Sequence, residues 1–260
     1  MADMDELIES LRTPTRLIRV FVGGGHDVFH VQQQALETIS PYFTNALKHD
    51  RFKEGKDGVL ELPEDEVDVW KVLLHLVLCR KLPSSLVTKD CMLTKENVLL
   101  AVRCWTMGDK YGIKEFQDTV MLRLLRYLNI MQCTQPGTIL DVQITLTVFE
   151  RTLRQSPLRM LVTDWTVMTM YGIKTTYMFA GSKSQYPVTQ PAKSVLASLE
   201  TLDGTGFFPA LTTQLAEYGH HGAQAFSWRT NPYSGDDPLW EAAYFLAFDE
   251  AAAYNPSTID

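Results

Sequence analysis

The stretch from Leu17 to Val31, with the sequence LIRVFVGGGHDVFHV, decides the fold predicted for the first half of the chain. Two short runs rich in β-branched and aromatic residues stand on either side of three glycines, Gly23-Gly24-Gly25. Such runs around a glycine-containing loop are typical of a β-hairpin. A phosphate-binding loop needs Lys and Ser or Thr after its last glycine, at the start of a helix, whereas His26-Asp27 and a second strand follow here. The sequence therefore predicts a hairpin.

Helical patterns and one further strand follow the hairpin. We predict helices over residues 33–39, 41–49, about 63–81, 97–110 and 114–128, and a strand over residues 59–62. The acidic run Glu64-Asp65-Glu66 is interpreted as helix-start charge, favourable against the amino-terminal dipole, and not as a general acid and base. Strands and helices do not alternate regularly, which argues against a doubly wound nucleotide-binding sheet.

The second half of the chain is harder to interpret. Residues 144–149 contain β-formers but can continue a helix, and the apolar segment 157–170 is undecided between helix and strand. Residues 171–207 suggest an extended connection, because they are rich in Gly, Ser, Thr, Pro and Lys. Residues 209–218 and 238–254 look like late helices. We expect residues 131–260 to be mainly helical.

Composition narrows the functional class. Hydrophobic residues make up 45% of the 260 residues and charged residues 21%, which is ordinary for a folded globular protein. The net charge is −7 and no Lys/Arg run is present, so we expect no nucleic-acid partner. The acidic start lacks the apolar core of a signal peptide, and no stretch approaches 18 uninterrupted apolar residues, so we expect no membrane partner.

The cysteines and histidines do not have metal-binding spacings. Four cysteines (Cys79, Cys91, Cys104 and Cys133) include no CxxC pair, and Cys79 and Cys104 lie in apolar helical patterns. We interpret them as reduced core thiols, which predicts a cytoplasmic or nuclear location. His26 and His30 straddle a turn and a strand, and His220-His221 are adjacent in a predicted loop. We expect no metal site.

Catalytic signatures are also missing from the sequence. No GxSxG elbow or similar nucleophile motif occurs. Trp70 and Trp105 lie on apolar stripes, which predicts core packing and not a ligand platform. We therefore expect no catalytic residue and no cofactor, and interpret the chain as a non-enzyme. The alternative is a catalytic constellation within residues 131–260, because catalytic groups need not be close together in sequence.

Short motifs in a fixed order give the first half a family resemblance. They are the hairpin of residues 17–31, SPYF at 40–43 with Ala46-Leu47, FKE at 52–54, VLELPEDE at 59–66, and MGDKYGI at 107–113 with Phe116-Gln117. This part of the chain resembles a BTB/POZ domain, particularly the type of filamentous fungi. Two departures are Gln32-Gln33, where the family has His-Lys, and Leu78-Cys79-Arg80, where it has Tyr-Thr-Gly.

The resemblance implies an α/β (α+β) fold with a small sheet and a cluster of short helices. It places a BTB/POZ domain at residues 15–130, an amino-terminal helix or tail at 1–14, and a carboxy-terminal region of unknown function at 131–260. In this family Asp109 is a structural acid that fixes the neighbouring turn by hydrogen bonds. No catalytic group is implied.

The family acts by binding proteins, and two partner surfaces follow from the resemblance. The first is self-association, as a homodimer or scaffold, through a helix at Asp5–Arg12 whose contact face is Leu7, Ile8 and Leu11. Alternatively, this short helix covers the protein's own core or is disordered.

The second surface is Phe52-Lys53-Glu54, which matches the hydrophobic-x-Glu motif of BTB proteins that bind a cullin. An apolar anchor at Phe52 can fill a partner pocket while the Glu54 carboxylate sets orientation. The chain would then be a substrate adaptor of a cullin-RING ubiquitin ligase, with residues 131–260 presenting the substrate. Alternatively, Phe52 packs back onto its own domain and Glu54 is merely solvated.

Overall fold

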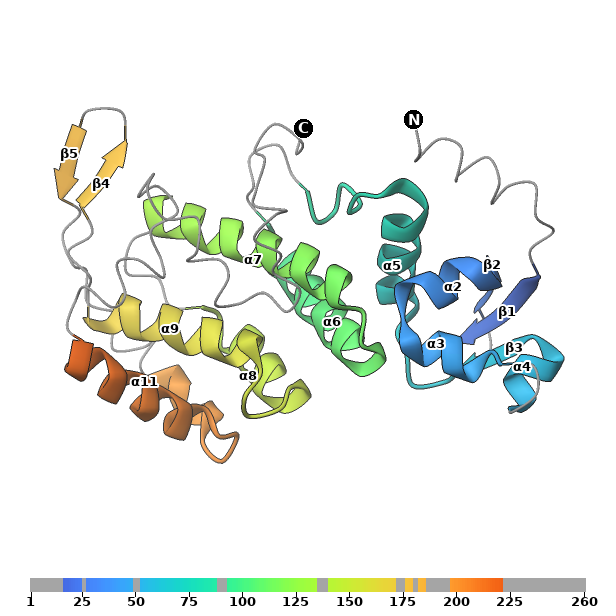
Figure 1. Cartoon of the computed structure of the whole chain (residues 1–260). Coiled ribbons are helices and arrows are strands. Elements are labelled where there is room, and N and C mark those ends of the chain that lie inside the picture. The colour runs from blue at the N-terminus through green and yellow to red at the C-terminus, as the bar shows by residue number, and fades with distance from the viewer. Residues whose placement is uncertain are drawn as a thin grey trace. The chain divides into compact units, whose positions relative to one another are not determined.

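A computed structural model of the chain describes residues 16–24, 27–48, 52–87, 93–134, 140–171, 176–179, 182–185 and 197–221. These residues form nine α-helices, one 3-10 helix and five strands, so the protein is a mixed α/β structure that is mostly helical (Figure 1). The chain divides into two compact units. Unit 1 is Met1–Lys81 with Met107–Ile113, and unit 2 is Leu82–Thr106 with Lys114–Asp260. The boundaries expected after residues 14 and 130 stay predictions.

The sheet of unit 1 has three strands in the order β2-β1-β3. Strand β1 (Leu17–Val22) pairs antiparallel with β2 (Asp27–Gln32) and parallel with β3 (Val59–Leu62), which confirms the predicted hairpin and third strand. Gly23 and Gly24 make the turn with φ of 65° and 80°, a conformation that glycine adopts without a steric penalty. Alternate residues of β1 (Ile18, Val20 and Val22) are fully buried. One face of the sheet therefore lies against the core.

Four helices and the end of a fifth complete unit 1. They are α2 (Gln33–Ile39), α3 (Pro41–Ala46), α4 (Lys53–Asp57), α5 (Val67–Cys79) and the last residues of α6 (Lys95–Tyr111). Ser40 begins α3: its hydroxyl oxygen accepts from Tyr42 N at 3.0 Å and its O–H donates to the Tyr111 carbonyl. The sequence predicts no helix at the position of α4.

An aromatic cluster forms the centre of unit 1. The Phe43 ring stacks on Tyr111 at 5.3 Å between centroids and meets Trp70 edge-on at 6.0 Å. Trp70 and Phe43 are fully buried. The predicted core role of Trp70 is confirmed, and so is that of Trp105, which is 1% exposed in unit 2.

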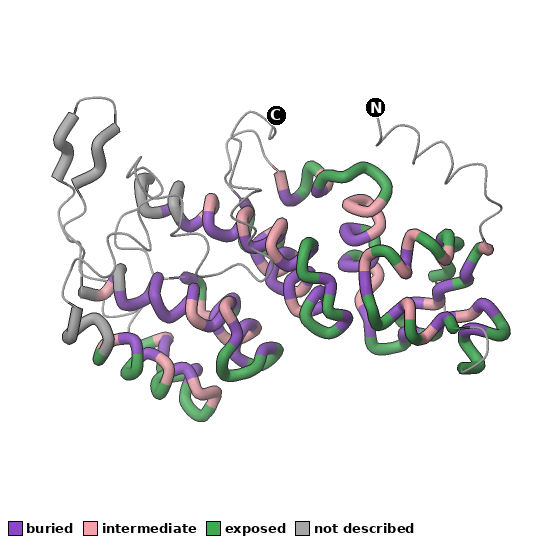
Figure 2. The backbone as a smooth tube through the Cα atoms, viewed as in Figure 1, coloured by how far each residue is buried: buried purple, intermediate pink, exposed green. Residues whose placement is uncertain are grey.

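Unit 2 is built mainly from helices. It contains most of α6, then α7 (Lys114–Thr134), α8 (Val142–Arg151), α9 (Pro157–Tyr171), β4 (Thr176–Phe179), β5 (Ser182–Gln185), the 3-10 helix η1 (Leu199–Leu202) and α11 (Phe207–His221). Helix α9 packs against α11, and α8 packs against both α9 and η1, with their facing sides buried (Figure 2). Phe149 of α8 meets Phe207 of α11 edge-on at 5.4 Å.

The two segments for which the sequence allows either helix or strand are helical. Residues 144–149 and 157–170 are helical, and the buried residues of α8 (Ile144, Thr145, Val148 and Phe149) have helical spacing. Residues 209–218 are confirmed as helix within α11. The expected helix at 238–254 lies outside the described residues. None of the helices in the described part of the chain is both long and apolar enough to cross a membrane.

Three local predictions are wrong. The extended connection expected over 171–207 contains the antiparallel pair β4–β5 and the helix η1. His220 and His221 lie in the last turn of α11, and not in a loop, because α11 continues to His221. Cys79 is exposed, whereas Cys104 is buried as expected. The residues of α5 around Trp70 are buried and its last residues are exposed, so Cys79 lies outside the core.

Candidate functional site

Helix α4 presents the Phe52-Lys53-Glu54 motif to solvent. Phe52 precedes the helix in extended backbone geometry, and its carbonyl oxygen accepts from Lys56 N at 3.2 Å. Half of the Phe52 side chain (50%) is exposed, and Lys53 and Glu54 are exposed beside it in the first turn. This exposure argues against the interpretation in which Phe52 packs back onto its own domain. We call these three residues the α4 surface.

Arg16 holds the carboxyl end of α4 in place. Its guanidinium donates to the Lys56 carbonyl at 2.7 Å and to the Gly55 carbonyl. The last carbonyls of a helix have no intrahelical partner and carry partial negative charge, so a cation there satisfies both needs. Gly58 ends the helix with φ of 64°, and its carbonyl accepts from Arg19 N of β1 at 2.9 Å. The helix is therefore tied to the sheet.

A close backbone contact fixes the other side of α4. A Cβ built on Gly55 would lie 2.3 Å from the Lys48 carbonyl oxygen and 2.9 Å from the Leu47 carbonyl carbon. Only glycine allows α4 to approach the segment after α3 so closely. Neither Arg16 nor Gly55 was predicted as part of this site. The glycine directly after Phe52-Lys53-Glu54 was the one local signal that could have drawn attention to this contact.

Asp65 is a second polar centre, with a role beyond the predicted helix-start charge. It lies in the turn before α5, and its side chain is 5% exposed and faces inward. Its Oδ2 accepts from Trp70 Nε1 at 3.1 Å and from the Tyr111 hydroxyl at 2.5 Å, while Oδ1 accepts from Lys110 Nζ at 2.6 Å. Burial and the Asp65 hydrogen bond raise the pKa of Tyr111 well above its ordinary value of 10.0. The network joins the turn before α5 to the end of α6.

The turn after α6 is closed by main-chain hydrogen bonds. Gly112 N donates to the Asp109 carbonyl at 3.2 Å, and Ile113 N donates to the Gly108 carbonyl at 2.8 Å. Gly112 has φ of 64°. The Asp109 side chain is exposed, so its structural role stays a prediction, whereas Asp65 is the buried acid of this region.

Of the other residues considered in the sequence, some lie within the described part of the chain and some do not. Leu7, Ile8 and Leu11, with the Asp5–Arg12 helix, lie outside the described residues, as does His26. His30 is exposed on β2. Among the described residues, no group of three or more His, Cys, Asp or Glu side chains is placed to hold a metal ion.

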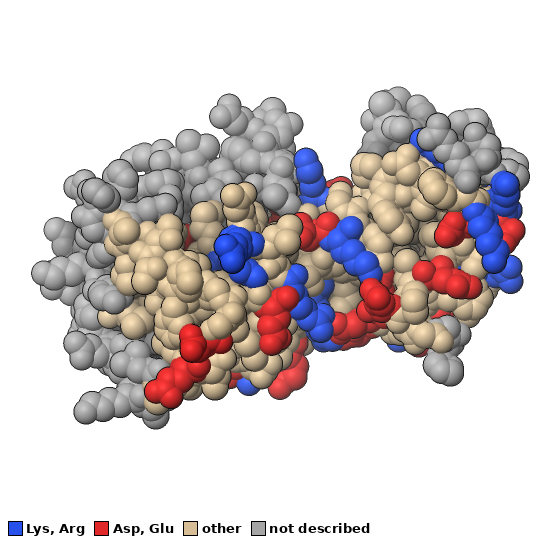
Figure 3. Space-filling model, turned by 90° about the horizontal axis from the view of Figure 1, so that it is seen from below, with Lys and Arg blue, Asp and Glu red and all other residues tan. Residues whose placement is uncertain are grey.

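Charge is mixed on the face shown in Figure 3. Lys and Arg side chains of the described residues alternate there with Asp and Glu side chains. The described part of this face therefore offers no broad basic surface of the kind that binds nucleic acid.

No protein-family model matches the chain, and no curated protein matches it.

Proposed function

We propose that this chain is a non-catalytic protein–protein interaction module of the BTB/POZ type, which scaffolds a complex through its first half. The observation that carries the proposal is the half-exposed Phe52 on a helix held by Arg16 and Gly55. An exposed aromatic side chain in a fixed position is what a partner's pocket can use as an anchor.

The family part of the proposal has structural support beyond the motifs. The hairpin and the strand of VLELPEDE pair in one small sheet, as the resemblance implies. Arg80 departs from the family's glycine, yet it ends α5 with φ of 55° and its N–H donates to the Leu76 carbonyl at 2.8 Å. This left-handed helix end is the geometry for which glycine is usually chosen. The departure therefore changes the residue at this position, while the local backbone keeps a glycine-like form.

The α4 surface suits a partner for energetic reasons. Covering the exposed half of a Phe side chain removes roughly 100 Å² of apolar area from water, which contributes about 2 kcal/mol. Because Arg16 and Gly55 already fix α4, little conformational entropy is lost when a partner binds it. The Glu54 carboxylate adds a charge that can orient the partner.

The partner that this surface favours is a cullin scaffold. In that case the protein is a substrate adaptor of a cullin-RING ubiquitin ligase, with residues 131–260 presenting the substrate. Self-association is the other candidate and rests on the family resemblance, since Leu7, Ile8 and Leu11 lie outside the described residues.

The adaptor hypothesis is tested by titrating the full chain with a cullin amino-terminal domain in a calorimeter. We expect binding that Phe52→Ala weakens by tenfold or more and Glu54→Ala weakens several-fold. Leu78→Ala is the matched control, because Leu78 is 76% exposed in unit 1 and lies outside the α4 surface. Absence of binding by the wild type would refute the cullin partner. Equal weakening by Leu78→Ala would refute the role of the α4 surface.

Self-association is tested separately by light scattering at tens of micromolar protein. We expect a dimer that loses mass when residues 1–13 are deleted. A monomer at that concentration would count against self-association, and a dimer that survives the deletion would move its interface elsewhere.

A further inference from the structure

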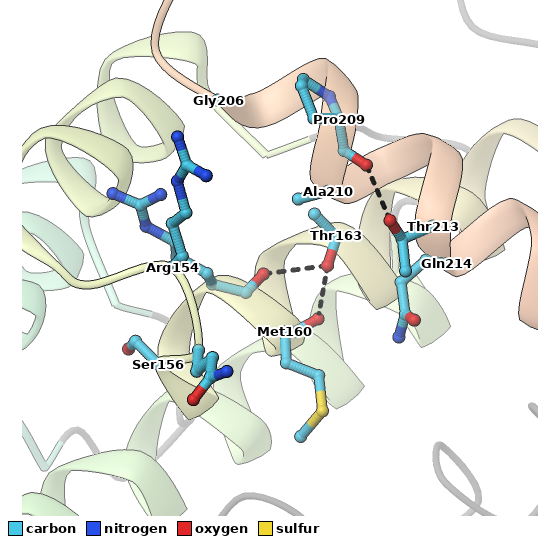
Figure 4. A pocket seen from close by; sticks show the side chains of 11 residues that line it. Arg154, Ser156, Met160, Thr163, Gly206, Pro209, Ala210, Thr213 and Gln214 are labelled. Atoms are coloured by element: carbon cyan, nitrogen blue, oxygen red, sulfur yellow. Dashed lines mark hydrogen bonds between the residues drawn. The ribbon is translucent and has the colours of Figure 1, made fainter.

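A cavity of about 450 Å³ lies within unit 2, between α9, α11 and the segment that leads into α9 (Figure 4). This volume is in the range of small-molecule sites. Two of its lining residues, Arg154 and Arg159, are basic, and no lining residue is acidic. The charged side chains that line the cavity are therefore basic, and the nearby Asp164 carboxylate accepts from the lining residue Gln214.

Arg159 is the buried charge of this cavity. It is 9% exposed, and its guanidinium carbon lies 4.7 Å from the centroid of the Phe149 ring. Nε donates to Thr152 Oγ1 at 3.0 Å, and Nη2 donates to the carbonyls of Phe149 and Thr152. All these acceptors are neutral. They orient the guanidinium but do not balance its charge.

The remaining nitrogen of Arg159 faces the cavity wall at Gly206. A Cβ built on Gly206 would lie 3.6 Å from Nη1, so the missing side chain leaves room beside this nitrogen. Among the described residues, no carboxylate forms an ion pair with Arg159, and a buried cation without an opposite charge is unfavourable. The pKa of Arg159 is accordingly lowered, first by burial and then by the nearby charge of Arg154. An anion in the cavity would remove this penalty.

The rest of the cavity lining combines positive charge with apolar surface. Arg154 is exposed, so its guanidinium can meet a ligand that enters from solvent. Ser156 precedes α9, a helix of 15 residues, and its Oγ accepts from Leu158 N at 3.2 Å. The amino end of α9 therefore adjoins the cavity and adds to its positive potential. Met160 of α9 and Pro209 and Ala210 of α11 supply apolar lining (Figure 4).

We propose that this cavity binds a small organic anion that carries a carboxylate or a phosphate monoester on a short apolar body. Arg159 and Arg154 bind the oxyanion, and Met160, Pro209 and Ala210 contact the body. The proposal is independent of the α4 surface, since all of these residues belong to unit 2.

The test measures, by calorimetry, the binding of three aromatic probes of similar size to the full chain. Benzoate carries the carboxylate, phenyl phosphate carries the phosphate monoester, and benzyl alcohol is the neutral control. We expect saturable 1:1 binding of benzoate or phenyl phosphate and much weaker binding of benzyl alcohol. Whichever anion binds more tightly identifies the preferred oxyanion.

Variants locate the site. Arg154→Gln should weaken binding about tenfold, as expected for loss of a charged hydrogen bond. Arg151→Gln is the matched control, because Arg151 is exposed on α8 and does not line the cavity. Arg159→Gln removes bonds that hold residues 149–152 and can unfold the unit. Ala210→Trp therefore provides the second test: it fills the cavity, leaves both arginines in place and should abolish binding.

Four results would overturn the proposal. The first three are absence of binding by both anions at about 10 mM, a concentration above the dissociation constants of most specific sites, equal affinity for benzyl alcohol, and binding that persists in Ala210→Trp. An Arg151→Gln variant that loses as much affinity as Arg154→Gln would likewise overturn it, because the effect would then be one of net charge.

Discussion

Replacing Asp65 by alanine removes the acceptor shared by three side chains at the centre of unit 1. Trp70 Nε1 and the Tyr111 hydroxyl both donate to Oδ2, at 3.1 and 2.5 Å, and Lys110 Nζ donates to Oδ1 at 2.6 Å. Trp70 is fully buried and Tyr111 is 3% exposed, so neither donor can turn to water in the variant. The Lys110 side chain is 46% exposed and can do so.

The loss of free energy of unfolding in Asp65→Ala follows from these differences in exposure. Each buried donor left without an acceptor costs about 1–3 kcal/mol. Losing the half-exposed Lys110 ion pair costs under about 1 kcal/mol. We therefore expect Asp65→Ala to lower the free energy of unfolding by about 2–7 kcal/mol, a large part of the roughly 5–15 kcal/mol that stabilises a typical domain.

Asparagine is the informative comparison at this position. Its carbonyl oxygen can take the place of Oδ2 and keep both the Trp70 and Tyr111 bonds, although these lose the charge assistance of a carboxylate. Its NH₂ group then faces Lys110, which can move into solvent. We expect Asp65→Asn to cost only about 1–2 kcal/mol. Alanine should therefore be clearly more destabilising than asparagine.

Urea unfolding followed by circular dichroism measures both variants. The urea dependence of the free energy must be the same as in the wild type for the comparison to hold. Because the two compact units can unfold separately, hydrogen exchange of the α5 amides assigns the loss to unit 1. The reasoning is refuted if Asp65→Ala costs under about 1 kcal/mol, or if asparagine is as destabilising as alanine. Tyr111→Phe should also lower the free energy of unfolding less in the Asp65→Ala background than in the wild type, because the Tyr111 hydroxyl has already lost its acceptor there.

Three further predictions concern backbone geometry and pH. Gly55→Ala should lower the urea midpoint by an amount corresponding to about 2–4 kcal/mol, because the added Cβ would lie 2.3 Å from the Lys48 carbonyl oxygen. A Cβ added at Gly112 would have no atom within 4 Å, so Gly112→Ala should cost only about 1 kcal/mol, for its positive φ. Equal effects of the two changes would contradict the close contact of α4. Arg80→Gly should raise the thermal midpoint, with a gain of up to about 1 kcal/mol, because φ at Arg80 is 55°, and a lower midpoint would contradict this. The raised pKa of Tyr111 means that its stabilisation is complete below pH 10.0 and is lost above it, where the unfolded chain ionises first. Urea unfolding at rising pH should show a fall above about pH 10 that is smaller in Tyr111→Phe, and identical pH profiles would contradict the buried hydrogen bond.

The local pattern of the chain was enough to predict most of unit 1. Strand β1 alternates buried and exposed residues, and the glycines after it permit the positive φ of the turn, so the hairpin could be predicted from neighbouring residues alone. The stripe through Trp70 likewise predicted α5 and its place in the core. In these segments, local preference and tertiary packing favour the same structure.

Helix α4 could not be predicted in this way, because five residues are too few to carry a helical pattern. Its stability comes from Arg16, which lies 39 and 40 residues before the carbonyls it binds. The motif Phe52-Lys53-Glu54 was visible in the sequence as a candidate contact. Only the tertiary structure shows that Phe52 is half exposed on a fixed helix.

The sequence by itself determined the hairpin, strand β3 and the apolar stripes of the longer helices, because these depend on residues close together along the chain. The tertiary structure decided the roles of Asp65 and Arg159. Asp65 reads locally as helix-start charge, but two of its three partners, Lys110 and Tyr111, lie 45 and 46 residues away. The cavity beside Arg159 exists only because α9 and α11 pack together. Burial and charge balance depend on what surrounds a side chain in space, and spacing along the sequence does not specify those surroundings.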